Sequence, residues 1–253
     1  MNVQNLAFYE VHDDRFAPTQ INVSPWNGNA QNGIAIAGLV AHLLASNSGT
    51  TEMHCARLTI DILGVVPRVP LEPRINVIRD GRRIQLVEVV LSAAGRSYVR
   101  ATALRARTEQ TPEQAHPLTR RLPDPAAAEG KLPWVRMDTL AGGFMQIGPG
   151  ARWVQFPRLE VVAGHAMTPL ERVAMVSDFG SGTAPLVSPK DWSFANLDIC
   201  IHLSRLPQGE WLLIDVTSES SGNGCGLVHS RLGDVDGMFG HAHQTVFLDP
   251  RPQ

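Results

Sequence analysis

The chain has 253 residues, of which 43% are hydrophobic and 18% charged, and its formal net charge is −2. This composition excludes extensive disorder, because enough apolar side chains are present to bury one large core or two small ones. Acidic and basic residues are spread along the chain, so nothing indicates a nucleic-acid partner or a basic membrane-binding surface.

The sequence shows no clear secretion signal, membrane span or disulfide pattern. The first ten residues lack the basic stretch and apolar core of a secretion signal. The longest apolar run, residues 33–45, is too short to span a bilayer. Cys55, Cys200 and Cys225 are too few and too scattered for a disulfide framework or a metal-ligand pair. We therefore expect a cytoplasmic protein without a membrane span.

The first half of the chain predicts one enclosed helix followed by strands. Residues 33–46 are apolar nearly all round and rich in Ala and Gly, which is typical of a helix surrounded by other elements. Residues 54–67 alternate in the manner of a half-buried strand. Asp80-Gly81 predicts a hairpin between two β-rich runs, and two more strands meet at a turn near Gly95. This order indicates an antiparallel sheet wrapped around the helix.

A polar segment with four prolines, residues 108–131, predicts a linker between two domains. The predicted N-terminal domain covers residues 1–107 and the C-terminal domain residues 132–253. The second domain is expected to contain, in order, a strand near 153–156, a helix from Thr168, and strands at 196–203, 211–218, 226–232 and 240–248, the last two joined by a turn at Asp236-Gly237.

The two halves repeat the same order of elements. A shift of 139 residues superposes the two predicted helices and the strands that follow them. At that shift Leu39 corresponds to Asp178, and Arg57 corresponds to Asn196. Polar candidate site residues thus occur in the second half, and the first half is expected to act as scaffold.

Asp178 is an acid on the packed face of the second helix. Thr168-Pro169 supplies a capping hydroxyl and a proline at the first helical position. Leu170, Val173, Ala174 and Ser177 follow at helical spacing, and Asp178 falls on the same stripe. A buried carboxylate is costly unless it is hydrogen-bonded or has a function. Burial raises the pKa of a carboxyl towards that of a general base; the competing interpretation is an ion pair with Arg172 or Arg205.

Six segments of the chain resemble the acyl-CoA thioesterase-like family of the type II kind, which is bacterial and peroxisomal. They are WNGNAQNGIAIAGLVAHLL, RLTIDILGVVP, RDGRRIQLVEVVL, SDFGSG, WSFANLDICIHLSRLPQGEWLLID and DVDGMFGHAHQ. The resemblance implies an α+β double hotdog fold, in which two tandem repeats each wrap an antiparallel sheet around a central helix. It also implies a thioester hydrolase that acts on fatty-acyl or related coenzyme A (CoA) thioesters.

The resemblance assigns three side chains to catalysis. In that family an acid on the second helix, a Thr or Asn at the start of the next strand and a Gln near the C-terminus jointly hold the water that attacks the thioester carbonyl. These roles fall on Asp178, Asn196 and Gln244. The products would be the free acid and CoA. No cofactor or metal is expected, and the expected assembly is a homodimer.

Strand periodicity supports one of these assignments and opposes another. Gln244 shares its parity with Ala242 and Val246, so it is expected to face the apolar interior. Asn196 shares its parity with Asp198 and would face away from the site, unless twist or a bulge at the strand start reorients it.

Asn32-Gly33, at the start of the first helix, forms a second candidate element. Free backbone N–H groups at a helix N-terminus favour negative charge and could polarise a thioester carbonyl. Asn32 and Gly33 are therefore candidate substrate-binding residues, with Gly33 as an oxyanion donor. The alternative is that Gly33 serves only close packing.

Other chemistries have weaker signals. His229, His241 and His243 lack a carboxylate or cysteine at ligand spacing, which favours a solvated strand face over a metal site. No serine stands in a G-x-S-x-G elbow. Two alternative functions remain: an acyl-CoA hydratase or dehydratase, for which folding would have to pair Asp178 with a histidine such as His165, and a non-catalytic acyl-CoA binding protein.

Overall fold

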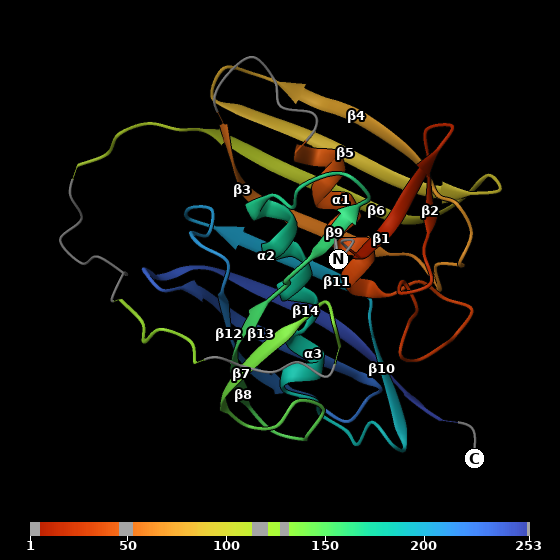
Figure 1. Cartoon of the computed structure of the whole chain (residues 1–253), viewed down its shortest axis with the longest axis vertical. Helices are drawn as coiled ribbons and strands as arrows, with labels where there is room; N and C mark the ends of the chain where they lie inside the picture. The colour runs from red at the N-terminus through yellow and green to blue at the C-terminus, as the bar shows by residue number, and fades with distance from the viewer. Residues whose placement is uncertain (1–5, 46–52, 113–120, 127–131, 252–253) are drawn as a thin grey trace, which may run out of the picture.

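A computed structural model describes residues 6–45, 53–112, 121–126 and 132–251. One curved sheet of eleven strands, antiparallel at every pairing, wraps around two helices (Figure 1). The strand order in the sheet is β4-β5-β6-β3-β11-β14-β13-β12-β8-β7, and β10 pairs with β14.

Helix α1 is followed in the first half by four strands of the large sheet, as the sequence predicts. Their bounds are α1 Gly33–Ala45, β3 Met53–Ile62, β4 Glu72–Asp80, β5 Ile84–Ala93 and β6 Arg96–Arg107. The Asp80-Gly81 hairpin joins β4 to β5, and the turn at Gly95 joins β5 to β6. Ten of the thirteen residues of α1 are buried, which confirms that this helix is enclosed.

The second half has the same order of elements with additional short ones. Its bounds are β7 Arg136–Ala141, β8 Gly150–Gln155, α2 Pro169–Asp178, α3 Gly180–Thr183, β10 Trp192–Asn196, β11 Asp198–Leu203, β12 Leu212–Glu219, β13 Cys225–Asp234 and β14 Gly237–Pro250. The predicted strand at 196–203 is wrong in its bounds, because a bend at Leu197 separates β10 from β11. Of the predicted linker, residues 113–120 and 127–131 lie outside the described residues.

The two halves are joined at one strand pair in the middle of the sheet. Strand β3 pairs antiparallel with β11, with Ile60 opposite Ile199 and Leu58 opposite Ile201. A small second sheet makes another connection. There β1 (Leu6–His12) pairs with β2 (Arg15–Pro18) and, in parallel, with β9 (Leu159–Val162) from the second half.

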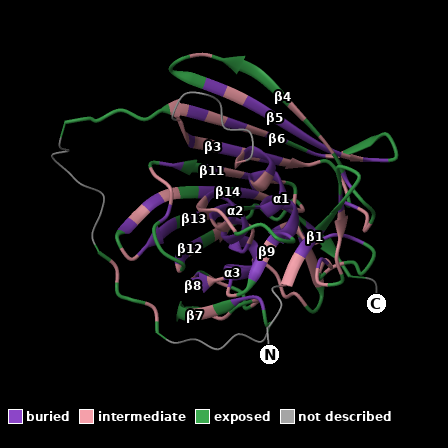
Figure 2. Ribbon diagram, turned by 45° about the horizontal axis from the view of Figure 1, so that its top comes forward, coloured by how far each residue is buried: buried purple, intermediate pink, exposed green. Residues whose placement is uncertain are grey.

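Helices α1 and α2 lie against each other inside the curve of the sheet, and Figure 2 shows both as mostly buried. Gly38 allows the close approach, because a β-carbon at that position would lie 3.1 Å from Met175 Cγ. Thr168 and Glu171 form a capping box at the start of α2. The buried Glu171 carboxylate also pairs with His42 Nδ1 of α1 at 2.9 Å, which ties the two helices together.

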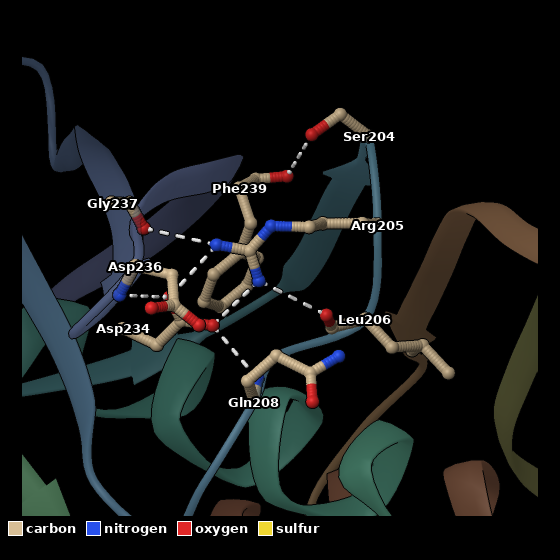
Figure 3. A network of polar contacts seen from close by, with 8 residues as sticks. All are labelled: Ser204, Arg205, Leu206, Gln208, Asp234, Asp236, Gly237 and Phe239. Carbon is tan, nitrogen blue, oxygen red and sulfur yellow. Dashed lines mark hydrogen bonds and ion pairs between the residues drawn. The ribbon is translucent and has the colours of Figure 1, made fainter. Parts of the chain in front are cut away.

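An ion pair between the partly exposed Arg205 and the buried Asp234 fixes the connection that follows β11. Arg205 donates two hydrogen bonds to the Asp234 carboxylate, at 2.6 and 2.8 Å (Figure 3). The backbone N–H groups of Gln208 and Asp236 donate to the same carboxylate. Burial alone would raise the pKa of Asp234, but these hydrogen bonds and the Arg205 charge outweigh it and lower the pKa. The predicted Asp236-Gly237 turn is thereby tied to the β11–β12 connection.

Within the described part of the chain, α1 and the other helices are too short or too polar to cross a bilayer.

Candidate active site

A cavity of about 720 Å³ lies where the N-terminus of α1 meets the C-terminus of α2. Apolar side chains from both halves make up most of its wall, and they include Trp26, Ile34, Val66, Trp134, Met137 and Phe194. Trp26 packs edge-on against Phe194, with ring centroids 4.5 Å apart. Apolar walls with a few polar groups at one place are typical of a small-molecule site.

Asp178 is the last residue of α2, and its side chain lies on the cavity wall. Burial raises the pKa of this carboxyl to about 6, and a hydrogen bond from Asn196 partly opposes the shift. Neither arginine considered from the sequence pairs with it, because Arg172 contacts Glu210 and Arg205 binds Asp234. The carboxyl can therefore exchange a proton near neutral pH.

Asn196 contacts Asp178, contrary to its strand parity. Its Nδ2 donates to Asp178 Oδ1 at 2.8 Å. The bend at Leu197 resets the alternation, so Asn196 continues β10 and shares its orientation with the buried Phe194. Leu197, at the bend itself, is 41% exposed and contributes to the cavity wall. Parity over 196–203 as one continuous strand would turn Asn196 away from the site, but the irregularity at the strand start, the expected exception, turns it towards Asp178.

Gly33 lies directly beside the Asp178 carboxylate. A β-carbon at position 33 would stand 2.6 Å from Asp178 Oδ1, so a larger residue would overlap the acid. Asn32 caps the helix, since its Oδ1 accepts from the N–H of Ile34 at 3.1 Å. Among the described residues no hydrogen bond uses the Gly33 N–H. Both Asn32 and Gly33 line the cavity.

Gln244 faces the interior, as its parity predicts, and is 2% exposed. Its Nε2 donates to the backbone carbonyl of Asp178 at 3.4 Å, so it touches the acid's backbone rather than its carboxylate. The side chain lies over Gly180, where a β-carbon would stand only 2.1 Å from Gln244 Oε1. Gln244 therefore lies behind the cavity wall, next to Asp178.

Sequence reasoning missed two residues at this place, Gly180 and Ser230. Gly180 leaves the space that the Gln244 amide occupies. Ser230 is buried on the inner face of β13, and its Oγ is 3.0 Å from the position of a Gly180 β-carbon. The available signal is a polar residue between Val228 and Leu232 on the apolar parity of a strand.

The histidines considered for a metal site lie on the outer face of the sheet. His229 and His243 contact each other through their Nδ1 atoms at 3.1 Å, and His229 Nε2 is 3.3 Å from Glu219 Oε1. In the described ranges no group of three or more potential ligands is placed to hold a metal ion.

No histidine of the described chain lines the cavity beside Asp178. His165, the nearest in sequence, packs instead against His42, with ring centroids 5.3 Å apart. The Asp–His pair that a hydratase would need is therefore not formed by the described residues at this acid.

Comparison with protein families gives two matches that together cover most of the chain. The profile of the acyl-CoA thioesterase N-terminal domain matches residues 22–106, and that of the acyl-CoA thioesterase C-terminal domain matches residues 98–248. No curated protein matches the sequence.

Solved structures with similar folds agree with these profiles. A TesB protein of Mycobacterium avium subsp. paratuberculosis superposes with a TM-score of 0.69 at 16% identity, covering 95% of each chain. The acyl-CoA thioesterase II TesB2 of Mycobacterium marinum gives 0.66 at 17% identity, covering 87% of this chain and 91% of its own. A hot dog fold protein of unknown function from Alicyclobacillus acidocaldarius gives 0.72 at 14% identity, covering 96% of each chain. The fold and the two profile matches show that the chain is a double hotdog protein and belongs to the acyl-CoA thioesterase family.

Proposed function

We propose that Asp178 is the general base of an acyl-CoA thioesterase that hydrolyses its substrate with one activated water. The observation that carries this proposal is the position of the carboxylate, on the cavity wall and against the N-terminus of α1, with its pKa raised to about 6. A carboxylate with such a pKa is mostly ionised at neutral pH and is a stronger base than an exposed aspartate.

The reaction balances with water as the only co-reactant. Asp178 takes a proton from water, and the oxygen attacks the thioester carbonyl carbon to form a tetrahedral oxyanion. The carbon–sulfur bond then breaks, and the proton passes from Asp178 to the departing CoA thiolate. The products are a free acid and CoA, and Asp178 is again ionised for the next turnover.

Asn196 and Gln244 support the base from two sides. The amide N–H of Asn196 fixes Asp178 Oδ1, which directs the other carboxylate oxygen towards the water. Asn196 Oδ1 has no partner among the described residues and is available to accept from that water. Gln244 donates to the Asp178 backbone carbonyl and so anchors the end of α2.

Gly33 supplies the oxyanion donor in this proposal. Its N–H belongs to the first turn of α1, where unpaired N–H groups and the helix dipole favour negative charge. The absence of a side chain at Gly33 makes room for the Asp178 carboxylate next to this N–H, so the donor and the base lie side by side. The attacking water and the polarised thioester carbonyl would then meet at the junction of α1 and α2.

The cavity supports an acyl group as the part of the substrate held inside. Apolar side chains dominate its wall, and no Lys or Arg of the described chain lines it. The acyl chain would lie among these side chains, with the CoA portion extending to the surface.

A panel of acyl-CoA esters tests the proposal, with release of CoA followed by a thiol reagent. The wild type should release thiol, and Asp178→Asn should lower kcat by about 10²–10⁴-fold. The mutation keeps the shape of the side chain and removes the base. Equal rates for Asp178→Asn and the wild type would refute the proposal, and absence of thiol release from every ester would favour a binding protein.

The proposal includes a homodimer in a reducing compartment. Edge strand β4 is largely exposed (Figure 2). It carries the exposed Val77 and Ile78, which supports contact with a second copy. Cys55, Cys200 and Cys225 are all free thiols, which supports the cytoplasm. Light scattering at several concentrations measures the assembly directly.

A further inference from the structure

Ser230 is a buried hydroxyl beside the candidate active site. It lies on β13 and is 2% exposed. Its Oγ has no hydrogen-bond partner among the described residues. Burying a hydroxyl without a hydrogen bond lowers stability, so an unpartnered buried serine requires a reason.

Gln244 has the complementary property. Its Oε1 is also buried and also has no partner within the described chain, while its Nε2 donates to the Asp178 carbonyl. Ser230 Oγ can therefore donate its hydroxyl proton, and Gln244 Oε1 can accept it.

The two side chains are diagonal neighbours on the inner face of one strand pair. Ser230 is opposite Ala242 and Val228 is opposite Gln244 in the register of β13 and β14. Ser230 Oγ and Gln244 Oε1 lie 3.0 and 2.1 Å from the position of a Gly180 β-carbon, so the two oxygens are at most about 5 Å apart. Rotation of the Ser230 hydroxyl or of the Gln244 amide would bring the two oxygens within hydrogen-bond distance.

We propose that Ser230 is a positioning residue that fixes the orientation of the Gln244 amide. This inference rests on the proposed thioesterase mechanism. An amide can be placed with either end towards Asp178, and only the NH₂ end can donate to its carbonyl. A hydrogen bond from Ser230 to Oε1 selects that orientation, because the oxygen is then held on the far side.

The consequence is a chain of contacts that leads from the sheet to the base. Ser230 orients Gln244, Gln244 anchors the carbonyl of Asp178, and the end of α2 keeps the carboxylate beside Gly33. Without Ser230 the amide samples both orientations. Asp178 is then correctly placed for only part of the time, which lowers kcat more than it changes substrate binding.

Other buried serines show what a purely structural role looks like. Ser177 Oγ donates to the carbonyl of Val173 at 2.8 Å, within its own helix. The partly buried Ser218 Oγ donates to the carbonyl of Ala184 at 2.7 Å. Ser177 is adjacent to Asp178 in sequence, so Ser177→Ala is the matched control for a lost buried hydroxyl near the base.

A double-mutant cycle on the full chain tests the inference, with kcat and KM measured for one good acyl-CoA ester. Ser230→Ala should lower kcat about tenfold and leave KM within about twofold. In a Gln244→Ala background the same substitution should change kcat by less than about twofold, because the residue through which Ser230 acts is gone. Ser230→Cys, which keeps the volume and a weak donor, should lie between the wild type and Ser230→Ala.

Three outcomes overturn the inference. They are wild-type kcat for Ser230→Ala, an equal loss from Ser230→Ala with and without Gln244, and an equal loss of kcat from Ser177→Ala. Failure of the mechanism itself is distinguishable, because Asp178→Asn would then retain full activity. If Asp178→Asn is inactive and Gln244→Ala is impaired while Ser230→Ala is normal, the mechanism stands and the role of Ser230 is refuted.

Discussion

Gly33 and Asp178 belong to different halves of the chain, and yet a β-carbon on Gly33 would stand 2.6 Å from the Asp178 carboxylate. The same place thus combines the positive end of α1 with the acid at the end of α2. In the proposed mechanism one half supplies the donor for the carbonyl oxygen and the other supplies the base.

This contact predicts that Gly33→Ala inactivates the enzyme. The new methyl group displaces the Asp178 carboxylate, and kcat/KM should fall by at least about 10²-fold, since misplacement by about 1 Å has that effect. Thiol release under steady-state conditions measures it. Gly28→Ala is the control, because nothing lies within 4 Å of a β-carbon there. Similar activities of the two variants would contradict a functional role for the contact.

The raised pKa of Asp178 predicts that Asp178→Asn stabilises the protein at neutral pH. The folded-state pKa of about 6 exceeds the ordinary value, so the native state holds a proton that the unfolded chain releases. This contribution to stability is present at low pH and is lost as the pH rises from about 4 through about 6.

Denaturant unfolding of the wild type and Asp178→Asn at pH 4 and pH 7.5 measures this effect. Asn lacks the penalty of a buried charge, so the variant should gain about 1–3 kcal/mol at pH 7.5, a range that allows for screening by water on the cavity side. The gain should largely disappear at pH 4. A variant that is less stable than the wild type at pH 7.5 would show that the carboxylate is favourably solvated instead.

The hydrogen bond from Asn196 to Asp178 predicts that substitution of Asn196 changes the pH profile of the reaction. In the wild type kcat/KM should rise with pH through about 6 as Asp178 ionises. The Asn196 hydrogen bond lowers the pKa of Asp178, so Asn196→Ala should move the inflection to higher pH. Asn196→Thr, which can still donate, should restore much of the wild-type profile. An unchanged inflection in Asn196→Ala would mean that the contact does not control the base.

The Arg205–Asp234 ion pair predicts that loss of Arg205 lowers the stability of the protein without changing kcat. Arg205→Ala leaves the buried Asp234 carboxylate without its cation and should lower the free energy of unfolding by about 3–5 kcal/mol. The kcat per folded molecule should remain near the wild-type value, since the pair does not line the cavity. Thermal unfolding and active-site-normalised kinetics measure both quantities. A large fall in kcat with normal stability would reverse this interpretation.

Periodicity and turn chemistry account for the parts of the fold that the sequence predicts. Helix α1 is apolar on all sides because other elements surround it, and the alternation on β14 places Gln244 inside. These features depend on local spacing, which a sequence displays directly.

Contacts made only by folding account for the parts that it does not predict. The bend at Leu197 reverses the parity of Asn196, and the sequence around it allows a strand irregularity there without fixing its position. Strand β9 has four residues and exists because β1 pairs with it from the other half. Gly180 and Ser230 are meaningful only once β13, β14 and α3 lie together, so their role requires the structure.

The pairing of β3 with β11, which joins the two halves, has a consequence for biosynthesis. Residues 53–62 leave the ribosome long before residues 198–203, because about 140 residues separate the partners. Throughout that interval one edge of β3 lacks its partner strand and can pair with another nascent chain. Substitutions that slow synthesis or folding of the second half are therefore expected to appear as insoluble protein, and limiting expression rate or supplying a chaperone should recover it.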